Sequence, residues 1–242
     1  MTKNAIEASK LVVHYGRHEA LKSVSLEVQT GATFGFIGPN GAGKSTFIKT
    51  ILGLVRPTSG EVRLHGQSPQ SVSSRAKLGF VPEEASYYRY LTPEEILRFY
   101  GRIFGIDRAT LDRRVTDLLT LVGLEKVRTK RASTFSKGMM QKISLAQSLI
   151  NDPDTLILDE PTSGLDPLAK LNLREILRRL REKGKTLFFS SHELSEVELL
   201  CDAVAVIVGG TVLVTGPVKE VVGDGERNLE RLFIQLVQGE SR

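Results

Sequence analysis

Apolar and polar residues alternate in strand fashion along the first part of the chain. KLVVHYG (10–16) and SVSLEV (23–28) show this alternation, and EVRLHG (61–66) follows a Pro-Thr-Ser-Gly turn. ATFGFIG (32–38) is a short apolar run that leads into glycines and then into the helical pattern KSTFIKTILGL (44–54). The pattern predicts a β-rich beginning in which a strand, a glycine-rich loop and a helix follow one another.

Residues 92–150 show a helical pattern in place of the strand pattern. Thr92-Pro93-Glu94-Glu95 is typical of a helix start, with threonine as the cap, proline in the first turn and Glu95 closing a capping box. Two further helices are predicted, one that ends at Gly123 and one that begins at Ser136. The apolar faces of the first two comprise Ile96, Leu97, Tyr100, Ile103 and Phe104, and Leu111, Val115, Leu118, Leu119 and Val122. We therefore expect an α-helical subdomain inserted between β-rich segments.

After this subdomain, strands and helices alternate. TLILDE (155–160) and TLFFSS (186–191) are apolar strands, and Asp166-Pro167 starts a helix between them. Two Val-rich segments joined by Gly209-Gly210 indicate a hairpin, and Asn228 opens a last amphipathic helix. The alternation predicts a parallel sheet in a single α/β domain. We expect three parts. A core with a β subdomain spans 1–86 and 152–218, a helical subdomain spans about 87–151, and a C-terminal helical extension spans 219–242.

Composition narrows the setting of the protein. The 242 residues carry a formal net charge of +5, which permits an anionic partner but selects none. The single cysteine, Cys201, excludes a disulfide framework and indicates a reducing compartment; its place in the predicted helix 192–202 favours a buried, inert thiol. No signal-peptide core is present, and the longest uncharged run, 203–218, is shorter than the roughly 20 residues of a spanning helix.

The nine residues GPNGAGKST stand between a predicted strand and a predicted helix, as a phosphate-binding loop requires. Glycines let backbone N–H groups turn toward one centre, and the start of the helix attracts an anion. We expect Lys44 to reach the β- and γ-phosphates of a nucleotide and the Ser45 hydroxyl to bind magnesium. The loop consists of Gly38, Pro39, Asn40, Gly41, Ala42, Gly43, Lys44, Ser45 and Thr46. The complete motif in this context argues against a plain glycine-rich turn.

A second candidate site element is LILDE, an apolar strand that ends in two carboxylates. Asp159 comes at the carboxyl end of this strand, where α/β sheets bind ligands, and suits a magnesium ligand. Glu160 suits the polarisation of a water molecule for attack on the γ-phosphate. Alone, the pattern fits an exposed acidic turn equally well. Together with the phosphate-binding loop, it favours the catalytic interpretation.

The order of the motifs GPNGAGKST, SKGMMQ, LILDEP, SGLD and SSHE resembles that of the nucleotide-binding subunits of ABC transporters. The resemblance extends from about Lys10 to Gly216. It implies a P-loop ATPase core, formed by a RecA-like α/β sheet and an N-terminal antiparallel β subdomain, with an inserted α-helical subdomain. It also implies ATP and Mg²⁺ as ligands. A second copy, or a homologous subunit, would complete a head-to-tail dimer with two ATP molecules between the subunits.

The resemblance implies a role for further residues. Tyr15 matches the aromatic residue that stacks on adenine, although a tyrosine at a strand end is more often simple packing. Glu160 matches the catalytic base, and His192 matches the histidine that contacts the γ-phosphate. Lys44 would offset the charge that develops on the same phosphate during hydrolysis.

Other matched residues would act across the dimer. Asp166 ends the segment Ser163–Asp166, which touches the partner subunit in the family. Ser136 and Gly138 match the family's signature turn, which faces the ATP held by the other subunit. Lys137 and Met139 depart from the signature; Lys137 would either add charge toward ATP or face solvent.

The stretch LGFVPEEASYY (78–88) resembles the segment that joins core to helical subdomain and senses the membrane partner. Glu83 replaces the glutamine expected there, and we expect its carboxylate still to reach magnesium, either directly or through water. Tyr87, Tyr88 and Tyr90 follow closely. Clustered aromatic residues on a loop favour an interface, and packing inside the helical subdomain is the equal alternative. Their position beside this segment favours docking of a transmembrane partner.

The predicted function is therefore that of an ATP-hydrolysing subunit that powers transport through a separate transmembrane permease. The C-terminal segment NLERLFIQLVQG resembles subunits of efflux systems, which favours export. The expected location is cytoplasmic, on the inner face of the membrane. The alternatives are a non-transport ABC ATPase that acts on ribosomes or DNA, or another P-loop enzyme. No nucleic acid is expected. The helix REILRRLREKGK (174–185) has a basic face, but leucines fill the opposite face and no aromatic platform accompanies it, so the basic face is expected to be a solvated surface.

Overall fold

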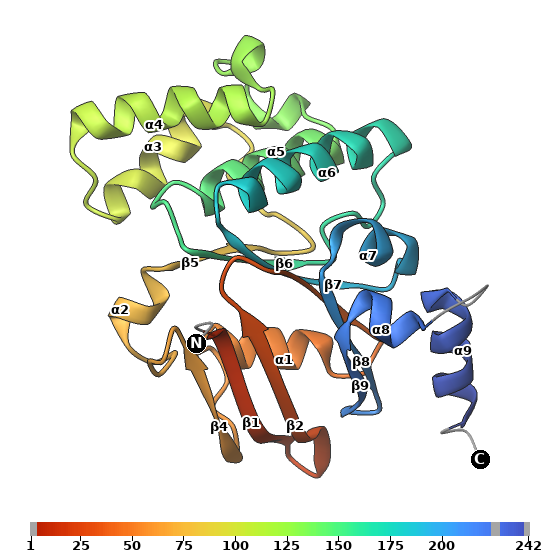
Figure 1. Ribbon diagram of the computed structural model, residues 1–242. Coiled ribbons are helices and arrows are strands. Elements are labelled where there is room, and N and C mark those ends of the chain that lie inside the picture. Colours follow the sequence, from red (N-terminus) through yellow and green to blue (C-terminus); the bar gives the residue numbers. More distant parts are fainter. Residues whose placement is uncertain (1–3, 224–227, 240–242) are drawn as a thin grey trace.

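The computed structural model describes residues 4–223 and 228–239 (Figure 1). Its N-terminal strands form a three-stranded antiparallel sheet in the order β2-β1-β4. The strands are β1 (Asn4–Tyr15), β2 (His18–Gln29) and β4 (Ser59–Leu64). Alternate side chains of β1 and β2 are buried on one face of this sheet, which confirms the predicted β-rich beginning.

A six-stranded sheet forms the centre of the molecule, in the order β5-β6-β7-β3-β8-β9. All neighbouring pairs are parallel except β8 and β9, which form the predicted hairpin through Gly209-Gly210. The strands are β3 (Thr33–Ile37), β5 (Leu78–Val81), β6 (Thr155–Asp159), β7 (Thr186–Ser191), β8 (Ala203–Val208) and β9 (Thr211–Pro217). The central strands β3 and β7 are buried throughout, because both faces of the sheet are covered.

The helices confirm most of the predicted starts. Thr92 forms the capping box of α3, while Ser136 and Asp166 cap α5 and α6 through their side chains. The helices are α1 (Lys44–Ile51), α2 (Val72–Arg75), α3 (Pro93–Ile103), α4 (Arg108–Leu121), α5 (Lys137–Ser148), α6 (Pro167–Glu182), α7 (Leu194–Leu200), α8 (Val218–Val222) and α9 (Leu229–Gly239). Two 3₁₀ turns, Glu125–Val127 and Ala132–Thr134, lie between α4 and α5.

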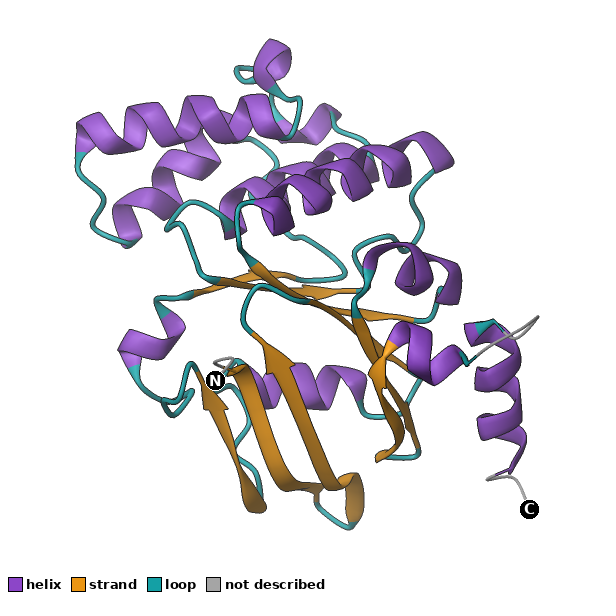
Figure 2. Cartoon of the chain, viewed as in Figure 1, coloured by secondary structure: helices purple, strands orange, loops and turns teal. Residues whose placement is uncertain are grey.

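Two apolar clusters fill the space on either side of the central sheet. Figure 2 shows α3 to α6 gathered on one side and the three-stranded sheet on the other. The cluster on the helical side joins the sheet to α3, α4, α5 and α6. The other cluster encloses α1, whose Phe47 ring lies 4.8 Å from that of Phe36 and 5.8 Å from that of Phe188, measured between centroids. This packing fixes α1, and with it the loop that precedes α1, against the sheet.

Two details differ from the sequence expectations. The predicted apolar face of α3 is buried at Ile96 and Leu97, but Ile103 and Phe104 at its end are 64% and 45% exposed. Cys201 follows α7 instead of lying within it, and burial raises the pKa of its thiol. Within 4–223 and 228–239, no helix is long and apolar enough to cross a membrane. Parts of the predicted C-terminal extension, 224–227 and 240–242, lie outside the described residues.

Candidate nucleotide-binding site

The glycine-rich loop connects β3 to α1 and passes close to its neighbours. A Cβ atom at Gly38 would lie 2.2 Å from the carbonyl oxygen of Ile207, and one at Gly43 would lie 2.7 Å from that of Ala20. Gly43 also has a φ of 108°, in the region that favours glycine. Glycine at these two positions therefore allows the loop to fold tightly above the sheet.

Lys44 begins α1 and turns back toward the loop. Its Nζ donates a hydrogen bond to the carbonyl oxygen of Gly38 at 2.6 Å and lies 3.2 Å from Oε1 of Glu160. The side chains of Lys44 and Glu160 are both 8% exposed. The ammonium group is thus held beside the loop by one carbonyl and one carboxylate.

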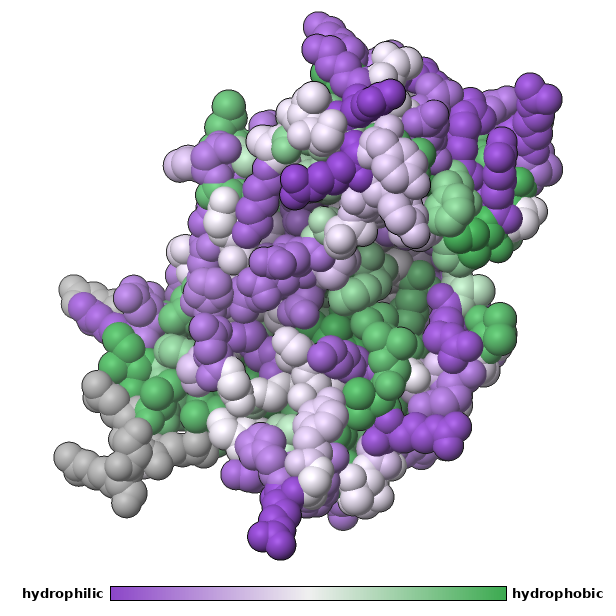
Figure 3. All heavy atoms as spheres, turned by 180° about the vertical axis from the view of Figure 1, so that it is seen from behind, coloured by the Kyte–Doolittle hydropathy of each residue, from purple (hydrophilic) through white to green (hydrophobic). Residues whose placement is uncertain are grey.

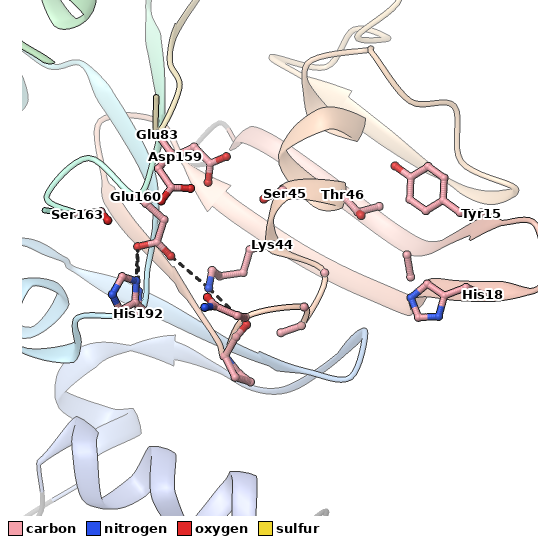
Figure 4. A pocket seen from close by; sticks show the side chains of 16 residues that line it. Tyr15, His18, Lys44, Ser45, Thr46, Glu83, Asp159, Glu160, Ser163 and His192 are labelled. Carbon is pink, nitrogen blue, oxygen red and sulfur yellow. Dashed lines mark hydrogen bonds and ion pairs between the residues drawn. The ribbon is translucent and has the colours of Figure 1, made fainter. Parts of the chain in front are cut away.

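Glu160 directly follows β6 and connects Lys44 to His192 (Figure 4). Its Oε2 lies 2.7 Å from Nδ1 of His192 and also accepts the backbone N–H of His192 at 3.2 Å. An ionised carboxylate has no proton to give, so Nδ1–H of the imidazole is the donor and Nε2 stays available. The backbone N–H of Glu160, a residue with a φ of 46°, donates to Oγ of Ser190.

Asp159 occupies the last position of β6, and its Oδ1 accepts a hydrogen bond from Oγ of Ser190 at 2.6 Å. Burial raises the pKa of the Asp159 carboxyl group; the hydrogen bond from Ser190 opposes this shift, and the nearby charge of Glu160 adds to it. An ionised Asp159 would consequently be stabilised by a cation placed against it.

The three predicted magnesium ligands face one cavity. Ser45, Asp159 and Glu83 supply a hydroxyl and two carboxylates, the hard oxygen donors that Mg²⁺ prefers. Among the described residues there is no group of three or more His, Cys, Asp or Glu side chains that would hold a metal alone. This donor set fits Mg²⁺ that shares its coordination with phosphate oxygens and water.

The cavity has a volume of about 500 Å³ and contains the whole predicted set for one nucleotide, apart from Gly38, which contributes through its contact with Lys44. Tyr15 and His18 lie at the end opposite to Glu160 (Figure 4). His18 and Ala20 were not among the predicted site residues; the position of His18 three residues after Tyr15, in the β1–β2 hairpin, could have indicated it. The lining residues are Tyr15, His18, Ala20, Pro39, Asn40, Gly41, Ala42, Gly43, Lys44, Ser45, Thr46, Glu83, Asp159, Glu160, Ser163 and His192.

Ser136, Gly138 and Asp166 are not part of this cavity. Oγ of Ser136 accepts the backbone N–H of Met139, and Oδ1 of Asp166 accepts that of Ala169. A Cβ atom at Gly138 would lie 3.4 Å from Cβ of Ala169, so the starts of α5 and α6 are adjacent. One chain therefore brings together the first group of predicted residues and keeps the second group at another place.

The three clustered tyrosines divide between the two interpretations. The Tyr87 hydroxyl donates to Oε1 of Gln147, and burial raises the pKa of Tyr87 to about 12. Tyr88 and Tyr90 are 64% and 63% exposed, and their ring centroids are 5.6 Å apart. Figure 3, seen from behind the view of Figure 1, shows apolar side chains gathered between the helical subdomain and the core. Tyr87 is thus a packing residue, while Tyr88 and Tyr90 are available to a partner.

Residues 21–163 match the family model described as "ABC transporter". The chain is 43% identical over 210 residues to an uncharacterized ABC transporter ATP-binding protein of Synechocystis sp., covering 86% of this chain and 59% of the relative. It is 37% identical over 237 residues to the lantibiotic transport ATP-binding protein SrtF of Streptococcus pyogenes, covering 98% and 99%. The Synechocystis relative is therefore considerably longer than the matched region.

A solved structure described as the ATP binding subunit of an ABC transporter has the same fold. It superposes with a TM-score of 0.86 at 32% sequence identity and covers 96% of this chain and 99% of its own. The α/β core and the inserted helical subdomain are therefore those of the ABC ATPase domains.

Proposed function

The chain belongs to the ABC transporter family, and on that premise we propose that it is an ATP-binding and ATP-hydrolysing subunit that powers transport through a separate transmembrane permease. The observation that carries this proposal is the contact of Glu160 with both Lys44 and His192 inside the loop cavity. This arrangement places an acceptor for a proton between an ammonium and an imidazole.

In the proposed reaction, the loop N–H groups and Lys44 hold the phosphates, and the triphosphate takes Lys44 from Glu160. The released carboxylate then accepts a proton from the attacking water, while Nε2 of His192 faces the γ-phosphate. Bound Mg²⁺ would supply charge neutralisation and orientation of the phosphates. Ser45, Asp159 and Glu83 would hold it, and Tyr15 would stack on adenine.

We further propose that the working unit is a head-to-tail dimer. Ser136, Gly138 and Asp166 lie outside their own chain's cavity and would contact the nucleotide of a second copy or of a homologous subunit. Hydrolysis per chain should then rise with protein concentration until dimers predominate. A rate per chain that is independent of concentration, together with monomers in sedimentation with MgATP, would contradict the dimer.

Export is the proposed direction of transport. It is supported by the 40% identity over 210 residues to the Nod factor export ATP-binding protein I of Cupriavidus metallidurans, which covers 86% of this chain and 69% of that protein. The proposed permease contact includes Tyr88 and Tyr90, the exposed pair beside the segment that follows β5. Replacement of Tyr88 by alanine should weaken assembly with the permease and leave nucleotide binding unchanged; intact assembly would remove Tyr88 from this role.

Purification of the tagged chain in detergent tests the function as a whole. Copurification of a multi-span membrane protein, with Mg²⁺-dependent ATP hydrolysis that is lost in Lys44→Ala, supports the proposal. Copurification of ribosomes or DNA without a membrane protein would instead support the alternative, a non-transport ABC ATPase.

A further inference from the structure

Two oppositely charged side chains, Glu83 and Lys137, line a second cavity of about 330 Å³ beside the nucleotide cavity. Neither forms an ion pair or a hydrogen bond with any of the residues that the structure describes. Glu83 lies after β5 and Lys137 is the first residue of α5, so the cavity separates two different parts of the fold. Both side chains are exposed, and they face a shared space without a charged partner among the described residues.

Glu83 also lines the nucleotide cavity, where carboxylates already outnumber the one ammonium. Asp159 and Glu160 are the other two carboxylates, and Lys44 is paired to Glu160. A nucleotide would enter this cavity with the Mg²⁺ that Glu83 is proposed to help hold, and the complex of nucleotide and Mg²⁺ still carries net negative charge close to Glu83. An opposite charge on the far side of Glu83 would offset that repulsion and hold the carboxylate in place.

Lys137 also contacts the turn Ser163–Asp166 of its own chain. Its Nζ lies 2.8 Å from the position that a Cβ atom would take at Gly164. The neighbouring Ser163 lines the nucleotide cavity and donates its backbone N–H to the carbonyl oxygen of Glu160. Lys137 is thus placed between two segments that both line its own chain's nucleotide cavity.

We propose that Lys137 is a positioning residue for the nucleotide site of its own chain, where it pairs with Glu83 when the cavity is occupied. The pairing connects the start of α5 to the segment after β5 and keeps Glu83 from repelling the phosphates. This inference rests on the proposed nucleotide binding. It differs from a role toward a partner subunit's nucleotide, because the residues involved belong to one chain.

A double-mutant cycle tests the pairing. The variants are Lys137→Gln, Glu83→Gln and the double variant, and the probe is a fluorescent ADP analogue with Mg²⁺, at protein concentrations where sedimentation shows monomers. Lys137→Gln should weaken binding by roughly threefold to fivefold, the upper end of the range for an exposed ion pair. In the Glu83→Gln background the same change should have less than about a twofold effect, because the charge that it offsets is gone.

Controls separate this role from a general effect of charge or folding. Lys142→Gln removes the same charge from α5 outside both cavities and should leave affinity unchanged, while Lys137→Arg should preserve binding. Melting temperatures of all variants without nucleotide should stay close to that of the wild type. Equal losses in both Glu83 backgrounds, or no loss at all in Lys137→Gln, would overturn the pairing. Failure of the wild type to bind the analogue would instead overturn the proposed function.

Discussion

Replacement of Glu160 by glutamine tests the central contact of the site. The side chain keeps its size and one acceptor oxygen, but it loses the charge that faces Nζ of Lys44 at 3.2 Å and one of the two acceptor atoms. It also loses the ability to take a proton from water. Binding and hydrolysis should therefore respond to the change in opposite ways.

The magnitudes follow from the burial of the pair. Removing one partner of a buried ion pair costs about 3–5 kcal/mol, and the loss here should fall at or below the low end because Lys44 keeps its hydrogen bond to Gly38. In the wild type the triphosphate must break the ion pair of Lys44 with Glu160. The variant lacks this pair, so its binding free energy for the triphosphate does not include the cost of breaking it. Loss of a general base lowers kcat by about 10²–10⁴-fold, which corresponds to about 2.7–5.5 kcal/mol of activation free energy.

Three measurements distinguish these effects. The melting temperature without nucleotide should fall, the increase in melting temperature on adding MgATP should be at least as large as in the wild type, and phosphate release should nearly cease. Dimers should accumulate with MgATP in size-exclusion chromatography. Glu84→Gln is the matched control, since this neighbouring carboxylate does not line the nucleotide cavity. Hydrolysis at the wild-type rate would remove Glu160 from its role, and a parallel loss of binding would show that it acts only by shaping the loop.

Three further changes test separate parts of the site. Asp159→Asn should raise the melting temperature of the nucleotide-free chain. Burial raises the pKa of the Asp159 carboxyl group, so ionising this group destabilises the folded chain. This destabilisation is absent below the ordinary pKa of the carboxyl group and grows as the pH rises through the raised pKa. The difference from the wild type should shrink as the pH falls toward about 4, and Mg²⁺ should no longer strengthen nucleotide binding. Tyr15→Ala should lower ATP affinity about fivefold to 150-fold, as expected for a stacking contact of about 1–3 kcal/mol, with an unchanged melting temperature and rescue by Tyr15→Phe; equal affinity of the alanine variant would exclude stacking. Gly43→Ala should lower the melting temperature more than Gly41→Ala, because a Cβ at Gly43 would lie 2.7 Å from the carbonyl oxygen of Ala20 while Gly41 has open space around it; equal effects would show that only the positive φ matters.

Much of the fold is encoded in signals that act over a few residues. The capping box at Thr92 and the Gly209-Gly210 turn fix a helix start and a hairpin locally, and both are found where the sequence places them. The short elements β5 and α2 carry too few residues for a period to show. Helical spacing puts Ile103 on the apolar face of α3, but it does not say which tertiary neighbours cover that face, and Ile103 is exposed.

The sequence predicted which residues form the site, but not all of the contacts between them. The motifs identified the residues of one cavity, because parallel strands bring their carboxyl ends to one edge of the sheet. They did not predict that one carboxylate, Glu160, contacts both Lys44 and His192, since three distant segments must meet for this. They also did not reveal the contact of Lys137 with the turn at Gly164.

Ser136 and Asp166, at the starts of α5 and α6, lie outside their own chain's nucleotide cavity. The starts of α5 and α6 are adjacent, and Ser136 and Asp166 each use a side-chain oxygen to cap a helix of their own chain. The remaining N–H groups of those first turns attract an anion, yet their own chain's nucleotide cavity lies elsewhere. Lys137 connects the two places, because it begins α5 and also contacts the turn that leads into the nucleotide cavity. In the proposed dimer, a nucleotide held by a second subunit would therefore meet these N–H groups, while Lys137 acts on the nucleotide site of its own chain.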